Sequence, residues 1–224
     1  MSGIQITTGA LVEPISRIEA REHLRLDDDV DDSQVRAYIR AATAWAEKYT
    51  GRVFISRSVS MYLDSFFPTN EPYWEGTVTA PQSLSRTNYI ELAAVPVLSV
   101  ESIKYFDDAD NESTWATSNY YVDAVSDIAK IVLRDGGTFP TDLRAANGVQ
   151  VNFTAGYGSA PNDVPEDIRI AILQYMTFLY EHRGDFERYP APTPPAVLKG
   201  LLAPYKVMRF GSNPYNKILK SGIG

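Results

Sequence analysis

The chain has 224 residues, 44% of them hydrophobic, and therefore holds enough apolar side chains for a sizeable core. It contains no cysteine, which excludes disulfides, thiol nucleophiles and thiolate metal sites. The formal net charge of -7 argues against a protein that coats DNA through clustered lysines and arginines.

The charge is unevenly distributed along the chain. Residues 182–224 hold seven basic and two acidic side chains, a balance of +5, which leaves -12 for the rest. Such an asymmetry predicts that the C-terminal segment seeks an acidic surface, such as a neighbouring copy. No stretch approaches the roughly 18 apolar residues of a membrane span, so we expect a soluble chain made in a reducing cytosol, with no membrane partner.

The N-terminal part predicts two helices. Ser16–Glu19 reads SRIE, which has the form of a capping box and predicts a helix over 16–25. The acidic run Asp27–Asp32 follows as a loop, and a second helix is expected over 33–50. Gly51 stands where a left-handed stop is needed. The second helix carries apolar or aromatic residues at helical spacing: Val35, Tyr38, Ile39, Ala42, Trp45, Ala46 and Tyr49.

Between residues 53 and 155 the pattern changes to short β-branched and aromatic runs separated by turn residues, which predicts an antiparallel β-rich insert. Phe106–Glu112 is expected at a hairpin tip, and Ser65–Asn88 in a long loop that carries Tyr73 and Trp74. The expected strands are 53–63, 89–93, 98–106, 119–123, 129–134 and 148–155.

A third helix is expected over 165–181. Before it, the glycines of Phe153–Gly158 are expected to allow a tight passage of the backbone from the last strand to this helix. Pro165 suits the first helical turn, and Glu166 and Asp167 place negative charge at the positive end of the helix.

The C-terminal part predicts an extended tail over 185–224. Prolines in Tyr189–Pro195 favour polyproline geometry, a short helix fits about 196–203, and the last twenty residues have no pattern for a core of their own. We expect this tail to dock on another chain, through the apolar, aromatic and basic residues Leu201, Leu202, Tyr205, Arg209, Phe210 and Tyr215.

These elements predict an α+β fold. An antiparallel helix bundle, with helices near 16–25, 33–50 and 165–181, is expected to carry the β-rich insert and the extended tail. The predicted domains are a helical core over 1–52 and 156–184, the insert over 53–155 and the docking tail over 185–224.

No residue pattern points to catalysis, a cofactor or a metal, so we expect none of these and no catalytic residue. His23 and His182 fall at separate helix ends without metal-ligand spacing. Asp27–Asp32 is oxygen-rich but lacks the glycine and glutamate positions of an EF-hand loop, which favours a solvated cap over a calcium site. Asp107, Asp108 and Asp110 share one turn and suit a hairpin better than acid–base chemistry.

Taken in order, several segments resemble the head-tail connector (adaptor) proteins of long-tailed bacteriophages and gene transfer agents. Each segment alone is weak, and the ordered set is more specific. The segments are Ile18–Leu26, Tyr38–Arg52, Phe153–Gly158, Val164–Leu173 and Leu201–Tyr205.

The resemblance implies a structural protein of the virion neck rather than an enzyme. Members of this family form a ring, usually of twelve copies, below the portal protein after the genome is packed. The ring extends the DNA channel, through which genomic DNA passes without sequence-specific binding. It also offers a platform for the next stopper or tail-completion protein.

Three other functions stay open at this point. A glycan-binding tail or surface module would use the aromatic residues Tyr73, Trp74 and Trp115. A small hydrolase would depend on a pair of carboxylates. Another neck or stopper protein would share the structural role of a connector at a different position in the particle.

Overall fold

The computed structural model divides the chain into two compact units. The sheet unit holds the described parts of Met1–Thr8 and Arg57–Ala155, and the helical unit holds those of Gly9–Ser56 and Gly156–Met208. Neither unit is continuous in sequence. The structure describes residues 3–7, 9, 12–26, 32–66, 89–183 and 194–208.

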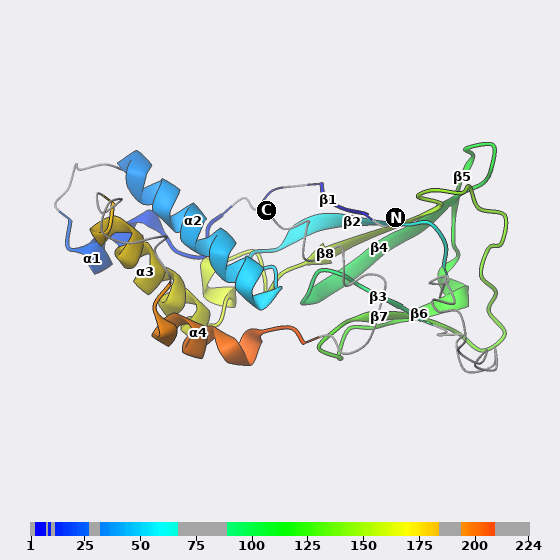
Figure 1. The fold of residues 1–224 in the computed structure, drawn as a ribbon. Coiled ribbons are helices and arrows are strands. Elements are labelled where there is room, and N and C mark those ends of the chain that lie inside the picture. The colour runs from blue at the N-terminus through cyan, green and yellow to red at the C-terminus, as the bar shows by residue number, and fades with distance from the viewer. Residues whose placement is uncertain are drawn as a thin grey trace, which may run out of the picture. The chain divides into compact units, whose positions relative to one another are not determined.

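The helical unit is built around the packing of two long helices (Figure 1). Their apolar stripes meet because apolar residues recur three and four positions apart on each helix, so that both bury one face. Two shorter helices pack on this pair. The helices are α1 (Arg17–Leu24), α2 (Asp32–Thr50), α3 (Glu166–Glu181) and α4 (Ala196–Leu202), with 3-10 turns at Pro161–Asp163 and Ala203–Tyr205.

Local sequence sets the helix ends. The Ser16 hydroxyl accepts a hydrogen bond from the Glu19 amide at 3.2 Å, which confirms the serine half of the predicted capping box. Arg25 ends α1 in the left-handed conformation with φ of 54°, and Gly51, with φ of 72°, ends α2 as predicted. None of the helices that the structure describes is long and apolar enough to cross a lipid bilayer.

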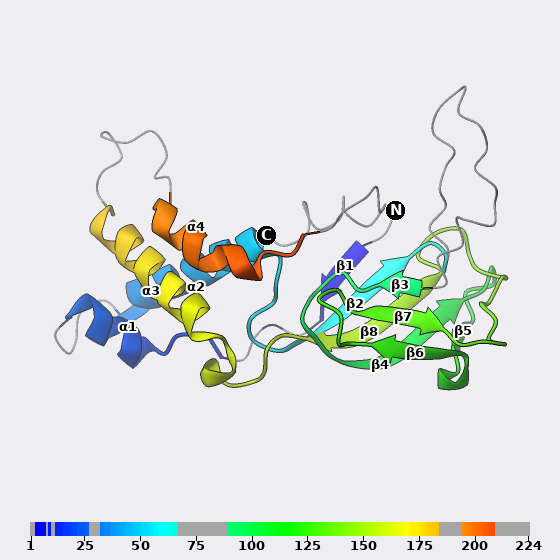
Figure 2. The ribbon, with the colours of Figure 1, turned by 90° about the horizontal axis from the view of Figure 1, so that it is seen from below.

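The sheet unit contains a five-stranded and a three-stranded sheet, and every strand pair in them is antiparallel. The three-stranded sheet covers one face of the larger sheet (Figures 1 and 2). The larger sheet has the order β1 (Gly3–Ile6), β2 (Arg57–Leu63), β8 (Val149–Ala155), β4 (Val97–Phe106) and β5 (Glu112–Thr114). The smaller has the order β3 (Tyr89–Glu91), β7 (Lys130–Leu133) and β6 (Tyr120–Asp123).

The central strand β8 buries every second residue, which gives the larger sheet one apolar and one polar face. Met61 on β2 and Phe153 on β8 are buried. On the opposite face, the Ser60 hydroxyl donates to Asn152 Oδ1 at 2.7 Å, and Asn152 Nδ2 donates to the Ser102 hydroxyl at 3.0 Å. This row of neutral polar side chains crosses three neighbouring strands.

An aromatic cluster completes the core of the sheet unit. Trp115 stacks on Tyr120 and Phe139 with ring centroids 4.8 Å and 5.3 Å apart, and Phe66 lies 4.9 Å from Trp115. The indole Nε1 donates to the carbonyl of Thr138 at 3.1 Å. The cluster satisfies the polar atom of the tryptophan while it buries the ring.

The two segments that link the units at residues 56–57 and 155–156 approach each other closely. The Ser56 amide donates to the Gly158 carbonyl at 2.8 Å, and the Tyr157 amide donates to the Phe54 carbonyl at 2.9 Å. Gly156 has φ of 140°, and a Cβ there would lie 2.5 Å from Ser56 Cα. The predicted use of glycine for a close approach after the strand is therefore confirmed.

The α+β class is confirmed, and the structure differs from the sequence-based expectations in four places. Strand β5 lies outside the predicted strands, at the end of the predicted hairpin tip. The first residues add strand β1 to the sheet unit, although the pattern assigns 1–52 to the helical core. The first predicted strand, 53–63, is β2 in the structure and begins at Arg57 instead of Val53, because Phe54 and Ile55 are buried in the core of the helical unit. Residues 194–208 fold with the helical unit instead of extending from it.

Candidate docking site of the helical unit

Arg169 joins the first and third helices of the helical unit. Its Nη2 donates to Glu19 Oε1 and its Nη1 to Glu166 Oε2, both at 2.8 Å. Because only 14% of the Arg169 side chain is exposed, this pairing is better shielded than an ordinary surface ion pair. The Glu19 carboxylate therefore binds Arg169 on α3, whereas the capping-box pattern predicts that it binds the backbone amide at the start of α1. The start of α1 is thereby held against α3.

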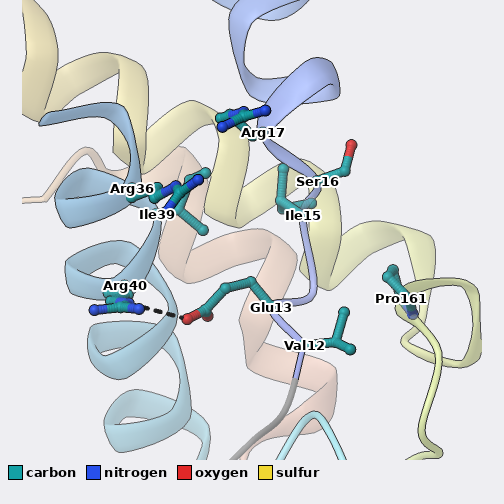
Figure 3. A pocket seen from close by; sticks show the side chains of 9 residues that line it. All are labelled: Val12, Glu13, Ile15, Ser16, Arg17, Arg36, Ile39, Arg40 and Pro161. Atoms are coloured by element: carbon teal, nitrogen blue, oxygen red, sulfur yellow. Dashed lines mark hydrogen bonds and ion pairs between the residues drawn. The ribbon is translucent and has the colours of Figure 1, made fainter. Parts of the chain in front are cut away.

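A pocket of about 280 Å³ lies between the segment that leads into α1 and the side of α2 (Figure 3). The α2 residues Arg36, Ile39 and Arg40 share one helix face, because they are three and four positions apart. Its floor is apolar, since Ile15 and Ile39 are 1% and 2% exposed. The chemistry of the pocket comes from Glu13, Ile15, Arg17, Arg36, Ile39 and Arg40.

The charge of the pocket is predominantly positive. The lining contains the guanidinium groups of Arg17, Arg36 and Arg40 and the carboxylate of Glu13, and Arg40 Nε lies 3.3 Å from Glu13 Oε1. The Arg40 side chain is 74% exposed, so this ion pair is weak and exchangeable with a competing anion. Planar guanidinium groups above an apolar floor suit a carboxylate ligand that also carries an apolar side chain.

The structure places some of the predicted docking residues of the C-terminal segment in the core of their own unit. Leu202 is 0% exposed and belongs to the core of the helical unit, and Leu201 packs against the same core. This corrects the expectation that Leu202 is reserved for another chain. The physical reason is the spacing of Leu198, Leu201 and Leu202, which gives α4 an apolar face for α3.

The segment after α4 is tied to its own unit by polar contacts. Arg52 Nε donates to the Tyr205 carbonyl at 2.6 Å, and the Val207 amide donates to the Thr50 carbonyl at 2.8 Å. The Tyr205 hydroxyl donates to Asp167 Oδ2 at 3.3 Å. Burial, followed by the charge of Asp167, raises the pKa of the Tyr205 hydroxyl. The segment up to Val207 thus belongs to the helical unit.

The other predicted docking residues, Arg209, Phe210 and Tyr215, lie outside the described residues. Of the aromatic residues considered for glycan binding, Trp115 is 3% exposed and has its indole nitrogen satisfied, so it offers no surface to a sugar. Tyr73 and Trp74 also lie outside the described residues.

The described residues contain no group of three or more histidine, cysteine, aspartate or glutamate side chains that could hold a metal ion. His182 Nδ1 lies 2.8 Å from the Phe178 carbonyl at the end of α3, which fits the predicted role of a helix-end histidine. Asp107 accepts hydrogen bonds from Ala109 and Asn111 at the hairpin tip, as the turn pattern predicts.

Sequence reasoning missed the arginine-lined pocket. The spacing of Arg36, Ile39 and Arg40 was available as a signal, because it places two cations beside an apolar residue on one helix face. What the pattern could not supply was the partner surface. Ile15 and Arg17 reach this face of α2 only through the fold of the segment before α1.

The comparisons with known proteins agree with this fold. Residues 18–91 match the model of the phage gp6-like head-tail connector protein family. No curated protein matches the chain in sequence. Among solved structures, the chain is similar to a protein in the neck of an empty gene transfer agent (GTA) particle, computed with C6 symmetry, with a TM-score of 0.71.

Two further solved structures contain similar chains. One is the virion of a native GTA particle, with a TM-score of 0.71, and the other is the neck of a native GTA particle computed with C12 symmetry, with a TM-score of 0.69. In all three cases the identity is 21%, and the match covers 94% of this chain and 98% of the other. The family match thus covers the N-terminal third of the chain, and the solved structures share its fold over nearly the whole length.

Proposed function

We propose that the protein is a structural head-tail connector (adaptor) that forms a ring below the portal of a phage-like particle and extends its DNA channel. The observation that carries this proposal is the match to the connector family model together with a fold shared over nearly the whole chain. The C12 symmetry of one matched neck supports a ring of twelve copies. The role is architectural and needs no chemistry from the chain.

The proposed partners follow from this position. The ring would contact the portal protein on one side and a stopper or tail-completion protein on the other. Genomic DNA would pass through without sequence-specific binding. The net charge of -7 supports passage of DNA, because a strongly basic channel would hold the phosphate backbone.

The proposed site of portal docking is the segment after Met208, which contains Arg209, Phe210 and Tyr215. The described residues before it are already engaged with their own unit through Leu202, Tyr205 and Val207, so truncation at Met208 preserves these contacts. A cut further upstream would remove the buried leucines of α4. It would then confuse loss of docking with loss of folding.

The test uses the full chain and a variant ending at Met208, each mixed with the portal protein of the same particle. Mass photometry and cryo-electron microscopy would measure the number of copies bound. We expect a ring of twelve from the full chain, and a loss of portal binding of at least about tenfold from the truncated chain. Circular dichroism should show the same helix content per folded residue in both.

The outcomes separate the two parts of the proposal. If the full chain does not associate with the portal, the connector function is wrong. If the truncated chain binds as well as the full chain, the connector function stands and the docking role of the last segment is wrong.

A further inference from the structure

We propose that the arginine-lined pocket of one copy receives the acidic run Asp27–Asp32 of the adjacent copy in the ring. This inference rests on the proposed ring and names one of its subunit contacts. A closed ring is built from head-to-tail contacts, which require two different and complementary patches on each subunit. The pocket and the acidic run provide such a pair, because they are opposite in charge.

The pocket side of the contact is defined by α2. Arg36 and Arg40 are exposed on one face of the helix, with the buried Ile39 beside them. Figure 3 shows both guanidinium groups beside the segment that carries Glu13 and Ile15. Arg40 has only the long contact with Glu13 to release, and Arg36 forms no ion pair with the described residues. Both cations are therefore available to an incoming carboxylate.

The occupant is identified by its composition. Asp27–Asp32 reads DDDVDD, five carboxylates around one valine. The aspartates match the guanidinium groups, which bind carboxylates in bidentate geometry, and the valine matches the isoleucine floor. The remaining acid of the pocket, Glu13, would be displaced from Arg40 by a run with several negative charges.

The acidic stretch at the β4–β5 hairpin tip is a poorer candidate, because three of its four carboxylates are already engaged. At the hairpin tip, Asp107 accepts three hydrogen bonds from its own turn. Asp110 lies 3.0 Å from Arg144 Nη1, and Glu112 lies 2.7 Å from Lys104 Nζ. The segment after Met208 is excluded on charge, since its side chains that are charged at neutral pH, Arg209, Lys217 and Lys220, are all basic.

Residues 27–31 lie outside the described residues, and the run ends at Asp32, which begins α2 one turn before Arg36. A contact within one copy is therefore the alternative to a contact between copies. Mixing two variants of opposite charge separates the two cases, because only a contact between copies is restored in the mixture.

The test exchanges the charges of the two patches in separate chains. The first variant is Arg36→Glu/Arg40→Glu, and the second is Asp27→Lys/Asp28→Lys/Asp29→Lys. Each variant alone sets like charges against each other at every subunit contact, whereas an alternating mixture makes every contact complementary. A control of equal charge change on the same unit is Lys48→Glu/Lys199→Glu, since both lysines are exposed.

Ring formation on the portal would be measured by mass photometry, with thermal melts to confirm folding. We expect each variant alone to need at least about tenfold more protein than wild type to form rings. The equimolar mixture should recover rings within about threefold of wild type, and the lysine control should match wild type. Raising the salt concentration should weaken the wild-type ring, because the contact is electrostatic.

Several outcomes would overturn the inference. Wild-type rings together with unimpaired rings from Arg36→Glu/Arg40→Glu would show that the pocket is no subunit contact, while the connector function stands. Loss of rings in both variants without rescue in the mixture would place the contact inside one copy. Loss in the pocket variant alone would show that another segment is the occupant. Failure of the wild type itself to form rings would instead contradict the proposed function.

Discussion

The helical unit and the sheet unit differ in what they bury. Among the described residues, the buried polar side chains of the helical unit are Thr43, Glu47 and Thr50, whereas the sheet unit buries only Ser60. Glu47 Oε1 accepts the Phe54 amide at 2.9 Å, and the Thr50 hydroxyl donates to the Ala46 carbonyl at 2.8 Å. The path of the chain after α2 is thus fixed by specific hydrogen bonds.

The sheet unit is instead stabilised mainly by the packing of apolar and aromatic side chains. Its core combines the apolar face of the larger sheet with the aromatic cluster around Trp115, and its polar groups lie on the opposite face. A change of side-chain volume should therefore destabilise the sheet unit most, whereas loss of a hydrogen-bond partner should destabilise the helical unit most. Three variants, in order of expected effect, test this contrast.

The largest effect is expected from Phe153→Ala. Phe153 is 0% exposed on β8, which lies between β2 and β4 at the centre of the larger sheet. Removal of the ring should lower the free energy of unfolding by about 3–5 kcal/mol, because the lost contacts and the cavity both count. Calorimetry would measure the loss, and hydrogen exchange should locate the loosened amides in the sheet unit.

The matched control for Phe153→Ala is Tyr121→Ala on the edge strand β6. The Tyr121 side chain is 46% exposed, so its truncation should change the free energy of unfolding by less than about 1 kcal/mol. Equal losses in the two variants would show that the buried face of the larger sheet does not carry the stability of this unit.

An intermediate effect is expected from Glu47→Ala in the helical unit. The change leaves the buried Phe54 amide without its acceptor, which should cost about 1–3 kcal/mol. Glu47→Gln keeps an acceptor oxygen and should lose less. Urea denaturation would measure the differences, with the exposed Lys48→Ala as control. If Glu47→Ala proves as harmless as Lys48→Ala, the hydrogen-bonded exit from α2 contributes nothing to stability.

The sequence predicts these elements with unequal success, for physical reasons. Helices α1, α2 and α3 were predictable because periodicity and caps are local signals. Examples are the hydrogen bond of the Ser16 cap and the left-handed conformation of Gly51. Most strands of the sheet unit were also predictable from short β-branched and aromatic runs between turn residues, although β5 was not. Strand β1 was not, because four residues with little pattern become a strand only through pairing with β2, more than fifty residues away.

The candidate site was less predictable than the fold. Leu202 reads as an apolar residue near the C-terminus, and only the packing of α4 on α3 shows that its own unit uses it. The pocket depends on residues before α1 meeting the middle of α2, which is a long-range fact of the fold. The local pattern identifies Arg36 and Arg40 as neighbouring cations on α2, but it does not show that Ile15 packs beside them.

The smallest effect is expected at the tip of the β4–β5 hairpin, where a polar group stabilises the sheet unit through a turn. The Asp107 carboxylate accepts the Asn111 side-chain amide and the backbone amides of Asn111 and Ala109. These hydrogen bonds, that of the Asn111 side chain first, hold the pKa of Asp107 below its usual value. Asp107→Asn should therefore lower the thermal midpoint at neutral pH by less than about 2 °C.

The pH dependence of the same variant gives the sharper test. A carboxylate whose pKa is lower in the folded chain stabilises it fully above the unfolded pKa of about 3.9, and this contribution is lost as the pH falls through the folded value. The difference in thermal midpoint between wild type and Asp107→Asn should thus be constant from pH 7 to about pH 5 and shrink below about pH 4. The exposed Asp108→Asn at the same tip is the control. A difference that stays constant into acid would show that the lost contacts are independent of the charge, so that the turn, like the core of the sheet unit, depends on shape alone.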